Sequence, residues 1–255
     1  MKIPANISVI LLASGLLVAG SCKKIVTPPS AIKHEEWTAS LNDSIANYKK
    51  DIDSITNRME DLRLTQAAEL ENFRFVKNSR EVAGYYILKS WSARYPLSST
   101  GLIARLNNRH DIEISAVLSS GKFTHINLSA GGDSYMTPSL RHDQALNYIA
   151  NGINTVCFSG PAADSIGQFI SRHVSQPITV KFIENSTSGS YSLPDAEKQM
   201  ITSTWSVYDS QRELVRLEKE LNYCSAKVNA CRKVLLAKDT VKDSVKERGK
   251  KTPVN

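Results

Sequence analysis

Two apolar stripes with a seven-residue repeat, one toward each end of the chain, constrain the fold most strongly. In both stripes the apolar side chains recur at alternating intervals of three and four residues, which is the spacing of a coiled-coil seam. The first stripe consists of Leu41, Ile45, Tyr48, Ile52, Ile55, Met59 and Leu62, and the second of Leu214, Leu217, Leu221, Cys224, Val228, Cys231 and Leu235. Neither Gly nor Pro occurs between Ala31 and Ala83. We therefore predict long helices over residues 31–74 and 193–238.

The segment between these helices, residues 75–192, has a different pattern. Short β-rich runs alternate with turn residues, and a hairpin is indicated at the polar turn of residues 107–110. The runs are residues 84–91, 102–107, 111–118, 123–128, 154–158 and 178–183. Ser159, Gly160 and Pro161 then begin a short amphipathic helix. The sequence predicts an α+β fold, with an antiparallel β-rich central domain and one short helix between the two long helices.

Each apolar stripe needs a partner, because a helix with a single apolar face is only marginally stable in water. Two such helices at the ends of one domain can cover each other as an antiparallel coiled-coil stalk. A homodimeric or trimeric coiled coil uses the same pattern and is the alternative. The polar, basic residues 239–255 have little to bury, so we predict that they are disordered.

The N-terminal residues predict export. Lys2 precedes an apolar run of about a dozen residues, which is too short to span a bilayer as a helix. Ala19, Gly20 and Ser21 then lead into Cys22. This arrangement predicts a signal peptide over residues 1–21.

The residues before Cys22 resemble the lipobox of bacterial lipoproteins, and the body resembles uncharacterised lipoproteins with coiled-coil segments. The resemblance implies acylation of Cys22, with residues 22–30 as lipid anchor and linker. Lys23 and Lys24 follow the cysteine without an acidic run, which by this resemblance favours the outer membrane, facing the periplasm. The alternative is simple secretion, because the same small residues fit the general signal peptidase.

Motifs for catalysis or metal binding are sparse in the sequence. The five histidines lack ligand spacing, no pair of cysteines has metal-site spacing, and we predict neither metal nor cofactor. Cys157 lies in a run that predicts a buried strand, and Cys224 and Cys231 belong to the second stripe. A hydrolase would have to combine His142 and Asp143 with Ser159, or with His173, without a nucleophile motif to support it.

An aromatic cluster offers a possible glycan site. Tyr85, Trp91 and Tyr95 surround the first β-rich run, and exposed rings of this kind can stack on sugars. Tyr86 must point to the opposite face from Tyr85, and burial in the core is the competing interpretation.

The leading hypothesis is a non-enzymatic, membrane-anchored periplasmic lipoprotein. It would present the β-rich domain on the stalk for protein interaction or envelope scaffolding. The alternatives are a glycan- or peptidoglycan-binding module and a hydrolase. The expected partners are the membrane, through the lipid, and a protein or the cell wall. A homo-oligomer could form through the coiled coil. The net charge of +7 lacks the clustering and the reading motif that nucleic-acid binding requires.

Overall fold

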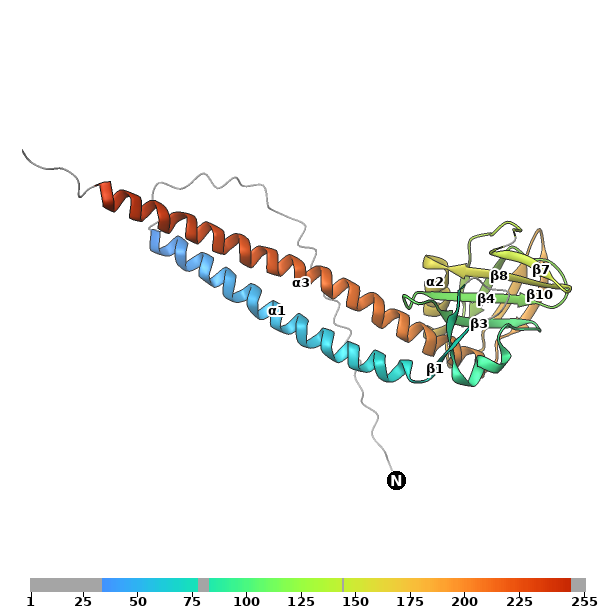
Figure 1. Cartoon of the computed structure of the whole chain (residues 1–255). Coiled ribbons are helices and arrows are strands. Elements are labelled where there is room, and N and C mark those ends of the chain that lie inside the picture. The colour runs from blue at the N-terminus through green and yellow to red at the C-terminus, as the bar shows by residue number, and fades with distance from the viewer. Residues whose placement is uncertain (1–33, 78–82, 144, 249–255) are drawn as a thin grey trace, which may run out of the picture.

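The computed structural model describes residues 34–77, 83–143 and 145–248, and it shows an elongated molecule with a helical arm and a β domain (Figure 1). The long helices are α1 (His34–Leu70) and α3 (Asp195–Arg248). The predicted signal peptide, Cys22 and the linker lie outside the described residues. The predicted α+β class and the β-rich centre between two long helices are confirmed.

The β domain contains two antiparallel sheets. The larger has the order β1-β2-β3-β4-β8-β7, and the smaller has the order β10-β9-β5-β6. The larger sheet comprises β1 (Phe73–Val76), β2 (Tyr85–Leu88), β3 (Gly101–Leu106), β4 (Ile112–Leu118), β7 (Asn147–Ala150) and β8 (Ile153–Ser159). The smaller comprises β5 (His125–Ala130), β6 (Asp133–Met136), β9 (Thr179–Ile183) and β10 (Thr187–Ser192). A 3-10 helix, η1 (Lys89–Arg94), follows β2, and α2 (Gly160–Arg172) follows β8.

One large apolar core holds the two sheets, α2 and the beginning of α3 together. Alternate side chains of β4, β5 and β9 enter it, because successive residues of a strand point to opposite faces, whereas β3 is buried on both faces. Its fully buried members include Leu102, Ile114, Ile126, Phe182, Ile166 and Met200. The predicted hairpin is confirmed, since the backbone N–H of Asn107 donates to the carbonyl of Asp111 between β3 and β4.

The first turns of α3 cover an edge of β3 that no strand occupies. The register of β2 with β3 consists of the single pair Tyr86 and Leu106. Further along β3, the N–H of Leu102 donates to Oε2 of Glu197 at 3.0 Å. The N–H of Ala104 lies 3.3 Å from the sulfur of Met200. Side chains of α3 thus satisfy backbone donors that a neighbouring strand would otherwise pair.

Beyond the β domain, α3 lies against α1, and the two helices run in opposite directions (Figure 1). A second apolar cluster joins them, formed by Ile55, Met59, Leu214, Leu217 and Cys224 and flanked by Tyr48, Ile52, Leu62 and Leu221. Both predicted stripes therefore contribute to the same cluster. We call α1 and the part of α3 after Tyr208 the helical arm.

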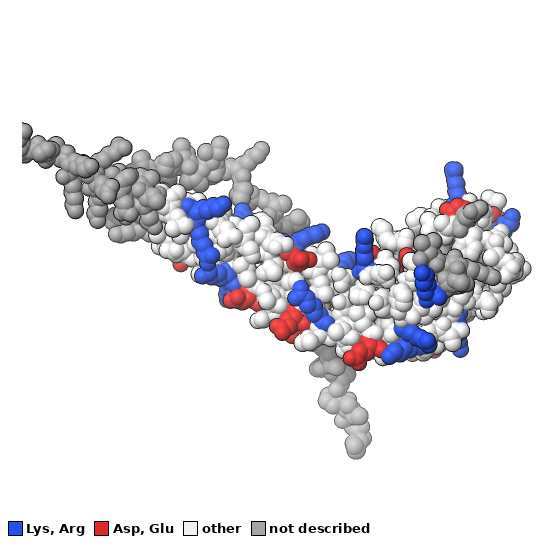
Figure 2. Space-filling model, viewed as in Figure 1, with Lys and Arg blue, Asp and Glu red and all other residues white. Residues whose placement is uncertain are grey.

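Charged side chains of both signs are interspersed on the face of the arm visible in Figure 2. Arg216 pairs with Glu213 and Glu220 on its own helix, and Arg58 of α1 reaches Glu213 at 2.7 Å. Exposed pairs of this kind contribute little stability each. The apolar cluster is therefore the main source of contact energy between α1 and α3.

Two predicted boundaries are wrong. The first helix ends at Leu70, because Phe73 and Phe75 belong to the aromatic and β-branched run of β1, which pairs with β2. The predicted disorder of residues 239–255 is contradicted for 239–248, where α3 continues to Arg248. No Gly or Pro interrupts the sequence between Leu235 and Gly249, so this stretch contains no residue that breaks a helix. Residues 249–255 lie outside the described part.

Candidate functional site

Two of the three rings predicted as a glycan platform, those of Tyr85 and Tyr95, lie against the buried Arg105. The guanidinium of Arg105 lies 3.6 Å from the centre of the Tyr85 ring and donates to the hydroxyl of Tyr95. Trp91 is only 6% exposed, and the guanidinium of Arg94 lies over its ring. The predicted platform of exposed rings is therefore wrong, because one face of Tyr85 is already occupied and Trp91 is in the core.

Arg105 is held by an ion pair across the sheet. Its Nε and Nη2 donate to Oε2 of Glu113, its direct neighbour on β4, at 3.0 and 2.8 Å. Burial acts to lower the pKa of Arg105, but Tyr95 and Glu113 raise it above its ordinary value. On the same face, Ser115 contacts the buried sulfur of Cys157 at 3.4 Å. Cys157 is thus in a buried strand, as predicted, and the cluster has a structural role.

An aromatic row that the sequence analysis missed lies nearby. Phe75, which is 48% exposed, meets Tyr86 edge to face with ring centres 5.3 Å apart. Tyr86 meets His110 in the same manner at 5.7 Å. Because the rings stand at 64° and 69° to each other, they do not present one flat surface for a sugar.

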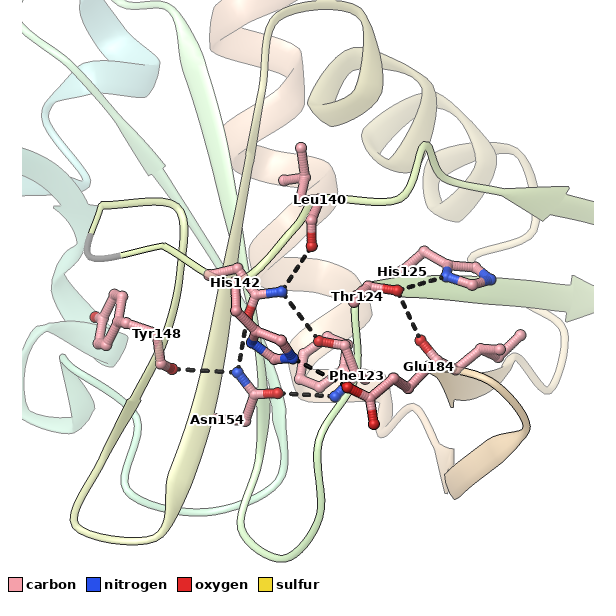
Figure 3. Close-up of polar contacts among 10 residues, drawn as sticks. Phe123, Thr124, His125, Leu140, His142, Tyr148, Asn154 and Glu184 are labelled. Atoms are coloured by element: carbon pink, nitrogen blue, oxygen red, sulfur yellow. Dashed lines mark hydrogen bonds and ion pairs between the residues drawn. The ribbon is translucent and has the colours of Figure 1, made fainter.

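The residues of the hydrolase hypothesis make separate contacts, of which Figure 3 shows that of His142 with Glu184. His142 pairs through Nε2 with Oε1 of Glu184 at 3.1 Å. The Oδ1 of Asp143 accepts the backbone N–H groups of Ala145, Leu146 and Asn147, which lower the pKa of the carboxyl group. Ser159 ends β8 opposite Glu113 and precedes α2. Asp143 therefore stabilises a turn and does not orient His142.

The His142–Glu184 pair is half-exposed, and such a pair can act as a proton acceptor. Close by, Oγ1 of Thr124 contacts both Nδ1 of His125 and the carbonyl of Ile183 (Figure 3).

Within the described residues, no three His, Cys, Asp or Glu side chains are placed to hold a metal ion. His173, the other histidine of the hypothesis, is buried and lies against Asp133 at 3.3 Å.

Two fully buried asparagines support this end of the domain. Oδ1 of Asn154 accepts the N–H of Phe123, and its Nδ2 donates to Oδ1 of Asn147 and to the carbonyl of Tyr148 (Figure 3). Asn147 in turn donates to the carbonyls of Phe123 and Leu140. These bonds tie β7 and β8 to the loops that carry His142 and Thr124.

Replacement of Asn154 by Leu is expected to destabilise the protein by about 2–4 kcal/mol, because the N–H of Phe123 and Oδ1 of Asn147 would both lose a buried partner. Urea denaturation followed by circular dichroism measures the change. Asn108→Leu, at an exposed turn position, is the control and should shift the free energy of unfolding by less than about 0.5 kcal/mol. Equal effects of both variants would contradict this structural role.

A pocket of about 610 Å³ lies where the arm meets the β domain. The end of α1, the turn into β1, the start of η1 and α3 contribute to its walls. We call it the neck pocket, and it is lined by Glu69, Asn72, Phe73, Leu88, Lys89, Ser90, Thr202, Ser203 and Ser206. The hydroxyl of Ser206 donates to Oε1 of Glu69 at 2.9 Å. The neck pocket therefore combines one carboxylate, one ammonium group and several hydroxyl groups.

The chain matches no known protein-family model, no curated protein and no solved structure. Of the helices in the described ranges, none combines the length and the apolar character needed to cross a bilayer.

Proposed function

We propose that this protein is a membrane-anchored lipoprotein of the bacterial cell envelope. In this proposal the β domain is presented on a coiled-coil stalk, formed by α1 and α3, for protein interaction or envelope scaffolding. A lipid on Cys22 would hold the chain at the outer membrane, facing the periplasm. The protein would act without catalysis.

The observation that carries the proposal is the position of the beginning of α1. This end lies at the tip of the arm, away from the β domain (Figure 1). With 37 residues, α1 is about 55 Å long at a rise of 1.5 Å per residue. A lipid attached ahead of α1 would thus be separated from the β domain by the length of the arm.

Lateral contacts support a coiled coil over a chance contact between two helices. The apolar cluster is drawn from both seven-residue stripes. Where the two helices approach the β domain, they also share a buried amide. Nε2 of Gln66 donates to the carbonyl of Val207 and to Oε1 of Gln211. This polar contact favours one register of the two helices, since a shift would leave the amide unpaired.

Metabolic labelling with a palmitate analogue tests the anchor. We expect the protein made in a Gram-negative host to incorporate the label, and the Cys22→Ala variant to lose essentially all of it, because acylation needs the thiol of Cys22. Cys231→Ala is the matched control and should retain the label. An unlabelled wild-type protein whose N-terminal peptide begins at an unmodified Cys22 would contradict the proposal.

A further inference from the structure

A buried carboxylate joins three elements where the arm helix enters the β domain. Glu197 lies in the first turn of α3 and is only 7% exposed. Its Oε2 accepts the N–H of Leu102 in β3 at 3.0 Å, and its Oε1 accepts the hydroxyl of Tyr191 in β10 at 2.6 Å. We call these two hydrogen bonds the Glu197 contact. Because β3 belongs to the larger sheet and β10 to the smaller, the Glu197 contact ties α3 to both sheets.

The carboxylate is held closely, and both of its hydrogen-bond donors are neutral. It lies against the backbone of β3, since a Cβ atom at Gly101 would be 3.0 Å from Oε1 of Glu197. Glycine at this position therefore leaves room for the carboxylate. A buried charge that is paired only with neutral donors is costly, because it has lost its hydration without gaining a counter-ion.

The charged groups of the surrounding elements do not supply that counter-ion. The ionisable side chains of these elements are Tyr191 of β10, Arg105 of β3, Lys89 and Arg94 of η1, and Asp195 and Lys198 of α3. Arg105 pairs with Glu113, and Lys198 pairs with Asp195 at 2.7 Å. Arg94 acts on Glu197 through its charge, but the two side chains form no salt bridge in the described structure.

We propose that the Glu197 contact is a pH-sensitive switch, which holds α3 to the β domain more tightly when the carboxyl group is protonated than when it is ionised. The protonated group keeps both hydrogen bonds. Oε2 still accepts from the N–H of Leu102, and Oε1 donates its proton to the hydroxyl of Tyr191, which can accept as well as donate. Protonation therefore removes the cost of the buried charge without the loss of a contact.

The pKa of Glu197 is displaced in the direction that this geometry requires. Burial raises the pKa above its ordinary value, and the hydrogen bonds from Leu102 and Tyr191 and the charge of Arg94 oppose that rise only in part. The resulting contribution to the free energy of unfolding is fully present below the pKa of an unfolded glutamate, about 4.3. It is lost as the pH rises through the higher pKa of the folded protein.

Comparison of the wild-type chain with Glu197→Gln tests the proposal, because glutamine has the shape of the protonated acid and cannot ionise. Urea denaturation between about pH 4 and about pH 7.5 gives the two unfolding constants. Their ratio, wild type over variant, cancels the ionisable groups that the two chains share. We expect this ratio to rise with pH, about tenfold for every unit by which folding raises the pKa.

Hydrogen exchange resolved by mass spectrometry locates the effect, with both chains measured at the same pH. Near the upper end of this pH range, Glu197→Gln should protect β3 and the first turns of α3 more strongly than the wild-type chain does. Near the lower end, protection should be equal. Equal protection at both ends of the range would contradict a switch at this contact.

Two further variants and one measurement on the unaltered chain complete the test. Glu218→Gln, at an exposed position of the same helix, is the matched control, and its ratio to wild type should not change with pH. Tyr191→Phe removes a donor that favours the anion, so its stability should fall more between low and high pH than that of the wild-type chain. The carboxyl carbon resonance of Glu197 reports the pKa without any substitution. A ratio of wild type to Glu197→Gln that falls with pH or stays within about twofold, or a carboxyl group that titrates at or below the ordinary pKa of glutamate, would overturn the proposal.

Discussion

Replacement of Arg105 by Met is expected to destabilise the β domain by about 3–5 kcal/mol, the range found when one partner of a buried ion pair is removed. The guanidinium is enclosed by Tyr85, Tyr95 and Glu113, and Arg105 is only 6% exposed. The Met side chain replaces the aliphatic stem of Arg105 but not its guanidinium. The contacts with Tyr85 and Tyr95 are lost with the ion pair, and the carboxylate of Glu113 is left without its cation. Urea denaturation monitored by circular dichroism measures the change.

Three further variants, Arg94→Met, the single change Glu113→Leu and a double variant, separate the ion pair from general damage to the core. Arg94→Met removes an exposed arginine that lies over Trp91, and it should cost less than about 1 kcal/mol. In the double variant Arg105→Met, Glu113→Leu, much of the lost stability should return, because no unpaired charge remains. If the double variant were as unstable as the sum of the two single variants, the ion pair would not be the cause.

Replacement of Leu217 by Asp is expected to separate α1 from α3 while the β domain remains folded. Leu217 is 2% exposed in the apolar cluster of the arm, and a carboxylate there would be buried without a cation. The expected loss is at least about 3 kcal/mol of local stability. Hydrogen exchange resolved by mass spectrometry should show lost protection over residues 41–62 and unchanged protection in β3, β4 and β8.

Val215→Asp provides a closely matched control for the arm. Val215 lies two residues earlier on the same helix and is 42% exposed, so the same new charge would remain in water. Protection of α1 should then be unchanged. Equal loss of protection in the two variants would mean that the contact between α1 and α3 does not depend on the apolar stripes, and the stalk proposal would fail with it.

The sequence predicted the elements that depend on local patterns. The seven-residue repeats specify helices through spacing alone, and the β3–β4 hairpin is set by apolar runs on either side of a polar turn. By contrast, β1 lies in a stretch without Gly or Pro, and its short aromatic run becomes a strand through pairing with β2. The edge strands β6 and β7, of four residues each, were also missed, as was the edge strand β10.

The site residues depended on contacts between distant positions. Arg105 sits in the run Leu102–Leu106, and nothing local indicates that Tyr85 and Tyr95 enclose its guanidinium. The neck pocket likewise brings together Glu69, Lys89 and Thr202 from three separate segments. In the sequence, each of these residues is a polar residue beside apolar ones, and ordinary surface positions have the same pattern. Only the tertiary fold brings them together.

The continuity of α3 has a mechanical consequence. One unbroken helix of 54 residues contributes to the core of the β domain near its start and to the apolar cluster of the arm further on. Because α3 has no break, a sideways force on the end of the arm far from the β domain would be transmitted as torque to the first turns of α3. The hydrogen bond from the N–H of Leu102 to Glu197 lies in these first turns and would be among the first contacts to be strained. If the chain is held at the tip of the arm, as we propose, a sideways load there would reach the edge of β3.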